Sequence, residues 1–118
     1  MKLAIPMDDT KQDVCVSFGR APYFLFYDVE TKEKTLLENP AAEAQGGAGI
    51  QAAQFIVDEG ADVLLTVRCG ENAKAVFDTA HLKVYKTAAT SAEENITLFL
   101  EDKLCVLEKF HAGFHGIQ

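Results

Sequence analysis

The stretch Ala44–Phe77 reads AQGGAGIQAAQFIVDEGADVLLTVRCGENAKAVF and decides the fold. A glycine-rich turn opens a helix, a buried strand follows, and a second turn opens a second helix. Backbone N–H groups at the start of a helix, together with the helix dipole, favour an anion. Two such turns close together in space would form an anion-binding cradle, and the second turn carries the thiol of Cys69.

Size and composition indicate one globular domain over residues 1–118. The chain has 118 residues and 48% of them are hydrophobic, which is enough for a core. No apolar run approaches the roughly 20 residues that a membrane span requires. The first residues turn polar too soon for a signal peptide, so we expect a cytoplasmic protein with a frayed tail over 108–118.

The charge of the chain argues against nucleic acid as a partner. The net charge is −7, whereas binding to a phosphate backbone draws on many lysines and arginines. A local positive site is still compatible with this charge. Arg20 and Arg68 fall near expected loop or strand-end positions and are the candidates for such a site.

The three cysteines do not form a disulfide or zinc framework. Cys15, Cys69 and Cys105 are odd in number, widely spaced and without a C-x-x-C pair. A small buried apolar side chain is the ordinary role of a free cysteine. Cys69 is the exception to consider, because it falls at the expected start of a helix and beside Arg68.

The first third of the chain is expected to be antiparallel β structure. Residues 2–7 form a short strand, and the alternation of Val14, Val16 and Phe18 predicts a second one over 14–18. Residues 23–29 are apolar and aromatic, and residues 35–38 return after a polar turn, which indicates a hairpin.

The remainder alternates helices and strands. An apolar stripe begins at Gly49 and ends at Gly60, residues 63–67 form a strand covered on both faces, and a second helix follows the turn at 68–72. Residues 82–85 form a further strand, and a doubled capping box at Thr90 and Ser91 begins a third helix. This order predicts an α/β fold: a mixed sheet with antiparallel N-terminal hairpins, parallel C-terminal βα units, and helices packed on it.

Three segments carry a family resemblance over about residues 1–105. They are FGRAPYF at 18–24, GGAGIQ at 46–51 and CGENA at 69–73. In this order and spacing they resemble the dinitrogenase iron–molybdenum cofactor-binding family, which includes NifX and NafY carriers, the C-terminal part of NifB and the orange protein. The family often has a histidine where this chain has Gly47, and a small or polar residue where it has Cys69.

The resemblance implies a ribonuclease-H-like topology and a non-catalytic carrier or scaffold for a metal–sulfur cluster. The cluster would contain molybdenum with iron, or molybdenum with copper, and sulfide. The implied partners are cluster-assembly or ATPase proteins. The net charge and the lack of a long apolar run predict no nucleic acid and no membrane as partners, and we expect a monomer or weak dimer.

The candidate site follows from the two turns. Such clusters are anionic, and ligands of open α/β sheets lie beyond the carboxyl ends of the strands. The expected cofactor-binding residues are Arg20, Gly46, Gly47, Gly49, Arg68, Gly70 and Asn72, and the expected metal ligands are Cys69, His111 and His115. We expect the helix start and the neighbouring arginine to lower the pKa of Cys69, which would make it a thiolate suited to iron or copper.

Other functions are compatible with the sequence. Cys69 could act as the nucleophile or redox thiol of an enzyme. A nuclease would need a set of carboxylates for two magnesium ions, and no convincing set is present at the strand ends. A regulatory interaction protein without a cofactor is the last alternative.

Overall fold

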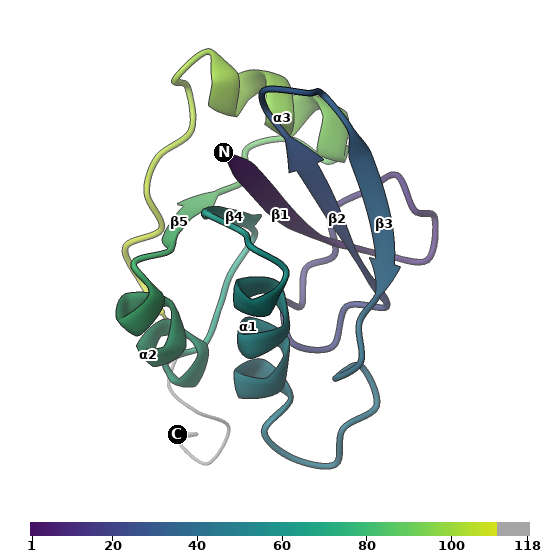
Figure 1. The fold of residues 1–118 in the computed structure, drawn as a ribbon, viewed down its shortest axis with the longest axis vertical. Coiled ribbons are helices and arrows are strands. Elements are labelled where there is room, and N and C mark those ends of the chain that lie inside the picture. Colours follow the sequence, from purple (N-terminus) through teal and green to yellow (C-terminus); the bar gives the residue numbers. More distant parts are fainter. Residues whose placement is uncertain (111–118) are drawn as a thin grey trace.

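The computed structural model describes residues 1–110 as a five-stranded mixed sheet with three helices (Figure 1). The strands are β1 (Lys2–Met7), β2 (Tyr23–Asp28), β3 (Lys34–Glu38), β4 (Val63–Thr66) and β5 (Lys83–Lys86), and the helices are α1 (Ala48–Asp58), α2 (Glu71–Ala80) and α3 (Ala92–Leu100). The strand order is β3-β2-β1-β4-β5; β1, β2 and β3 pair antiparallel, whereas β1, β4 and β5 pair parallel. The predicted mixed α/β sheet is confirmed.

Helices cover both faces of the sheet. Figure 1 shows α1 and α2 side by side, with α3 apart from them. Along β1 the side chains alternate between two cores, because successive residues of a strand point to opposite faces. Ala4 packs with residues of α1 and α2, whereas Leu3 and Ile5 pack with residues of α3.

The central strands are buried as the sequence predicts. All four residues of β4 are buried, which is the pattern of a parallel strand covered on both faces. Phe55, which falls toward the polar side of α1, is half-buried against the rings of Phe24 and Phe26 on β2, at centroid distances of 6.1 and 6.0 Å. These contacts hold α1 over the antiparallel half of the sheet.

The predicted strand over residues 14–18 is wrong. β2 pairs along the whole of one edge of β1, and β4 pairs with Leu3 and Ala4 on the other edge, so another strand could pair only near Met7. The segment is a loop whose Val14 forms only an isolated bridge with Met7. The alternation of apolar residues over 14–18 has a different cause. Val14 packs in the core on the α3 side of the sheet, and Phe18 packs in the core on the side of α1 and α2.

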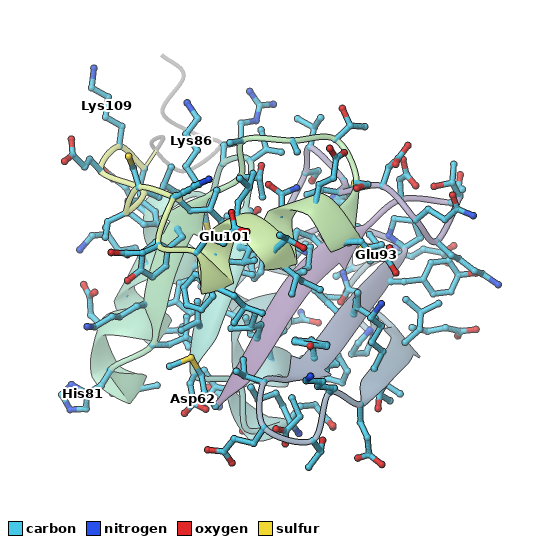
Figure 2. All side chains as sticks on the ribbon, turned by 90° about the horizontal axis from the view of Figure 1, so that it is seen from above. Asp62, His81, Lys86, Glu93, Glu101 and Lys109 are labelled. Atoms are coloured by element: carbon cyan, nitrogen blue, oxygen red, sulfur yellow. The ribbon has the colours of Figure 1, made fainter. Side chains whose placement is uncertain are left out.

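The third helix begins as its sequence predicts. The Ser91 hydroxyl accepts a hydrogen bond from the Glu94 N–H at 3.1 Å, which is the capping-box contact. In Figure 2, α3 crosses the sheet, with Glu93 near its start and Glu101 just after its end. Two N–H groups in the first turn of α3 thus have acceptors, because the Ala92 N–H also donates to the Gln12 carbonyl at 2.9 Å.

Candidate anion-binding site

A pocket of about 570 Å³ lies where three loops meet beyond the carboxyl end of β4. The loops are the one before β2, the one that leads into α1 and the one that joins β4 to α2. The lining residues are Ser17, Phe18, Gly19, Arg20, Gln45, Gly46, Gly47, Ala48, Gly49, Ile50, Arg68, Cys69, Gly70, Asn72 and Ala73. The two glycine turns therefore converge on one pocket, at the place where open α/β sheets bind ligands.

The start of α1 is built from glycine for a backbone reason. Gly47 is the N-cap residue and has φ 67°, a left-handed conformation that L side chains rarely adopt. It provides no side-chain cap. Gly47 does accept a hydrogen bond from the Gln51 N–H at its carbonyl. Within residues 1–110, the N–H groups of Ala48 and Ile50 have no acceptor, which leaves donors at the pocket.

The start of α2 is open in a similar way. Gly70 is its N-cap residue, in an extended conformation and again without a side-chain cap. Its carbonyl accepts from the Lys74 N–H at 3.2 Å, so the helix proper begins at the pocket wall. Asn72 and Ala73 of the first turn line the pocket, whereas the Glu71 side chain does not. Two helix starts therefore direct their positive ends at one volume.

The charged side chains of the pocket are both cationic. Arg20 and Arg68 are exposed and line it, and no carboxylate does. Nη1 of Arg20 donates to the carbonyls of Ala42 and Ala44, at 3.2 and 2.6 Å. The Arg68 guanidinium has no hydrogen-bond or ion-pair partner within residues 1–110. A chain of net charge −7 thus keeps a local positive field at this pocket.

The expectation of a lowered pKa at Cys69 is wrong. The side chain is 1% exposed and packs in the core with Phe18 and Phe77. Burial raises the pKa of the Cys69 thiol to about 12, because a thiolate is poorly solvated there, and the hydrogen bond from the Gly70 N–H opposes this only in part. Cys69 forms part of the pocket wall as a neutral thiol.

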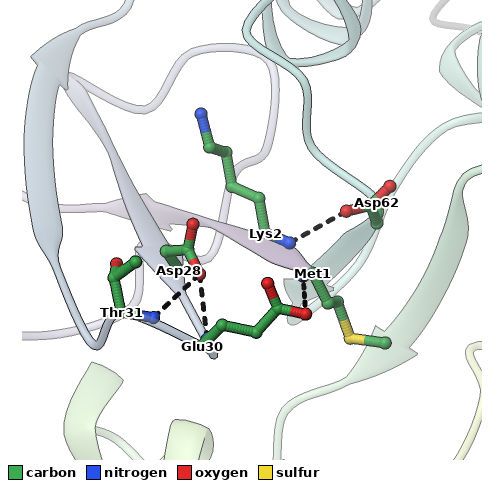
Figure 3. Close-up of polar contacts among 6 residues, drawn as sticks. All are labelled: Met1, Lys2, Asp28, Glu30, Thr31 and Asp62. Atoms are coloured by element: carbon green, nitrogen blue, oxygen red, sulfur yellow. Dashed lines mark hydrogen bonds and ion pairs between the residues drawn. The ribbon is translucent and has the colours of Figure 1, made fainter.

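The opposite end of the sheet contrasts with the pocket. There the backbone N–H of Lys2 donates to Oδ2 of Asp62, and Oδ1 of Asp28 accepts from the N–H groups of Glu30 and Thr31 (Figure 3). These two hydrogen bonds from Thr31 and Glu30 lower the pKa of Asp28. The carboxylates of Asp62 and Asp28 thus accept hydrogen bonds from backbone N–H groups of the chain itself.

Two of the predicted metal ligands, His111 and His115, lie outside the described residues. Within residues 1–110, no group of three or more histidine, cysteine or acidic side chains is arranged to hold a metal ion. None of the helices in that same part of the chain is long and apolar enough to cross a membrane. Ser17 and Gln45 also line the pocket, and no local sequence signal marks them, because loop packing alone brings them there.

Comparisons with known proteins identify the family of this chain. Residues 1–102 match the family model described as dinitrogenase iron–molybdenum cofactor. An uncharacterized protein of Methanocaldococcus jannaschii is 35% identical over 113 residues, which cover 93% of this chain and 92% of that protein. The chain therefore belongs to the dinitrogenase iron–molybdenum cofactor family.

Solved structures show the same fold. The apo form of the orange protein from Desulfovibrio gigas aligns with a TM-score of 0.83 at 28% identity, covering 90% of this chain and 92% of that one. A Thermotoga protein named after NifB aligns with a TM-score of 0.78 at 33% identity, covering 92% and 95%. The family resemblance drawn from the three sequence segments is confirmed.

Proposed function

We propose that this protein binds an anionic metal–sulfur cluster in the pocket and acts as a non-catalytic carrier or scaffold. The observation that carries the proposal is the convergence of two uncapped helix starts and two arginines on one pocket without a carboxylate. Backbone N–H groups and guanidinium groups stabilise an anion without bonding to its metals. Membership of the family named for the iron–molybdenum cofactor supports the same cargo.

The chemistry of the pocket floor suits sulfide better than oxide. Phe18, Cys69 and Ala73 are buried and present apolar surface to the pocket. Sulfide is larger, softer and more weakly hydrated than oxide, so it tolerates contact with such surface at lower cost. The volume of about 570 Å³ admits a small cluster that contains molybdenum with iron or copper.

Each predicted site residue has a role in this proposal. Gly46, Gly47, Gly49 and Gly70 allow the backbone to approach the cluster, since a side chain at these positions would occupy space beside it. Arg20, Arg68 and the Asn72 amide add donors at the rim.

Cys69 is proposed as a metal ligand that ionises only when a metal arrives. A thiol loses its proton when it binds a metal. The raised pKa of Cys69 therefore weakens its metal binding but does not abolish it. His111 and His115 stay predictions as further ligands. Their contribution is tested most simply by replacing both histidines with alanine.

A carrier needs proteins to deliver and receive its cargo. We propose cluster-assembly or ATPase proteins of the cytoplasm in these roles, with this chain as a monomer or weak dimer. The competing functions fit the pocket less well. A thiol enzyme needs a reactive thiolate, whereas Cys69 is buried, and a two-magnesium nuclease needs carboxylates, which the pocket lining lacks.

The test is anaerobic titration with tetrathiomolybdate and Cu(I), and separately with ferrous iron and sulfide. We expect a saturable visible absorption band with a stoichiometry of one cluster per chain. Arg68→Glu should weaken binding on the order of a hundredfold, because it removes one positive charge and adds a negative one. The control Lys83→Glu changes the net charge equally at the opposite end of the sheet and should bind as the wild type does.

Two results would overturn the proposal. One is the absence of saturable binding with either set of ions. The other is an equal loss of affinity in Arg68→Glu and Lys83→Glu, which would mean that only the net charge matters. Cys69→Ser tests the thiol separately, because an unchanged band would remove Cys69 from the site and leave the anion-binding proposal intact.

A further inference from the structure

A buried asparagine joins the loops that form the pocket. Asn39 follows β3 and is 6% exposed. Its Nδ2 donates to the carbonyls of Gly19 and Ala21, at 3.0 and 2.9 Å, and its Oδ1 accepts from the Ala41 N–H at 2.9 Å. Both amide hydrogens are therefore used, and they hold the loop before β2 against the loop that leads to α1.

Arg20 adds a second connection between the same loops. Its Nη1 donates to the carbonyls of Ala42 and Ala44. Segment 39–44 leads directly into the glycine turn. The hydrogen bonds of Asn39 and Arg20 therefore fix the segment that precedes the first residues of α1. Ordering a flexible loop when a ligand binds would cost affinity, and these bonds remove part of that cost beforehand.

Gly19 fixes where the start of α1 lies. A Cβ atom built on Gly19 would lie 3.0 Å from both the Cα and the N of Gly49, and 3.3 Å from the carbonyl carbon of Ala48. The backbone of the loop therefore packs directly against the backbone of the helix start. Gly19 therefore supports the backbone at the start of α1, where Ala48 and Gly49 line the pocket.

We propose that Asn39 is a positioning residue of the anion site. It does not line the pocket, and it acts by holding residues 19–21 as a support against which the start of α1 is fixed before a ligand binds. The effect of Asn39 on ligand affinity rests on the proposed function, whereas its effect on the rigidity of the glycine turn is independent of that function. The glycine turn and the segment FGRA thereby form one preorganised unit.

Asn95 provides a matched control within the same chain. It is 0% exposed, its Oδ1 accepts from the N–H groups of Ala88 and Ala89, and its Nδ2 donates to the carbonyls of Ala89 and Ser91. It thus holds a loop through the same kind of bonds, but that loop leads to α3 and does not line the pocket. Removing either asparagine should lower stability, and only one should affect the pocket.

The experiment compares Asn39→Ala with Asn95→Ala at a temperature where both are folded. ¹⁵N relaxation gives the order parameters of Gly46–Ile50, and tetrathiomolybdate titration gives the affinity. In the wild type and in Asn95→Ala we expect order parameters near the rigid value of about 0.85 and equal affinity. In Asn39→Ala we expect order parameters below about 0.6 in this turn and an affinity at least about tenfold weaker.

The outcomes separate the two proposals. Suppose that the wild type binds tetrathiomolybdate and that Asn39→Ala keeps both a rigid turn and full affinity. This result would overturn the positioning role of Asn39 and leave the proposed cargo unaffected. If the wild type binds nothing, the cargo proposal fails, and the order parameters alone decide the positioning role. Asn39→Asp serves if Asn39→Ala does not fold, since it keeps the acceptor for Ala41 and loses both donors; a rigid turn there would also overturn the role.

Discussion

The starts of α2 and α3 show two ways of treating the same exposed backbone groups. At α3, the Ser91 hydroxyl caps the Glu94 N–H, and Glu93 and Glu94 place carboxylates in the first turn. At α2, the N-cap residue is Gly70, which has no side chain to offer, and the helix start faces the pocket. The first helix start is closed to an external anion and the second is available to one.

An uncapped helix start therefore indicates an anion site only when the groups around it also suit an anion. An uncapped helix start on an open surface is satisfied by water. Here two uncapped starts, at Gly47 and Gly70, share one pocket with Arg20 and Arg68. The capped start of α3 therefore serves as the internal reference for the open start of α2.

The largest expected effect concerns the thiol just before α2. With the pKa of Cys69 at about 12, the fraction present as thiolate at neutral pH is roughly a thousandfold below that of an ordinary cysteine. Alkylation by iodoacetamide, followed by mass spectrometry, should therefore modify the exposed Cys105 long before Cys69. Rapid modification of Cys69 in the folded protein would show that the field of the helix start outweighs burial.

The same thiol gives a pH dependence of stability. Its pKa is raised in the folded state, so its contribution is complete below the ordinary cysteine pKa and is lost as the pH rises toward about 12. The free energy of unfolding should fall across that window, and Cys69→Ala should flatten the fall. Denaturant titrations at a series of pH values measure both, and equal slopes in the two proteins would contradict the assignment.

Converting the start of α2 into one like that of α3 is the next test. Gly70→Asp supplies a capping carboxylate at an N-cap residue that already has an extended backbone, so stability should rise by a few tenths of a kcal/mol. The same carboxylate should weaken tetrathiomolybdate binding about tenfold or more, because it competes for the N–H groups and repels the anion.

Gly70→Asn is the control for that substitution. It caps the helix equally but carries no charge, so its affinity should lie between those of the wild type and Gly70→Asp. Equal binding by all three proteins would mean that the start of α2 takes no part in the site. Titration by absorbance gives the affinities, and thermal unfolding gives the stabilities.

Opening the start of α3 should have a smaller and purely structural effect. Ser91→Ala removes the cap at the Glu94 N–H and should lower the free energy of unfolding by about 1 kcal/mol. The affinity for tetrathiomolybdate should not change, since this helix start is remote from the pocket lining. A new anion site in Ser91→Ala would show that removing a cap is sufficient for anion binding and would contradict a role for the pocket.

The smallest effect is expected at the opposite end of the sheet. The ion pair between the Met1 amino group and Glu30 is long, at 3.7 Å, and both side chains are well exposed. Glu30→Gln should therefore change the unfolding free energy by less than about 0.5 kcal/mol. Calorimetry at low and moderate salt checks this, and a larger loss would mean that this end of the sheet also depends on its charges.

Most of the fold could be predicted because its signals are local. The buried run Val63–Thr66, the glycine turns and the capping box at Ser91 each predict an element from neighbouring residues. The strand predicted over 14–18 failed for a non-local reason. Its alternation matches a strand, but β4, which lies about fifty residues further along the chain, pairs with Leu3 and Ala4 on that edge of β1, and only an isolated bridge from Val14 to Met7 forms.

The candidate site was predictable in its turns but not in its details. Glycines and arginines near strand ends indicated an anion site, and the pocket brings Gly46, Gly70 and Arg68 together. The pKa of Cys69 was missed, because the depth of a side chain depends on Phe18 and Phe77 packing over it. Asn39 was missed too, since an asparagine before a proline reads as an ordinary turn residue.

The most direct test of the central claim is a tetrathiomolybdate titration of ¹⁵N-labelled protein, followed through its backbone amides. We expect saturable shifts, with one shared dissociation constant, for Gly46–Ile50 and Gly70–Ala73, and none for Ala92–Asn95 at the capped start of α3. Shifts confined to one of the two glycine turns, or equal shifts at the start of α3, would contradict it.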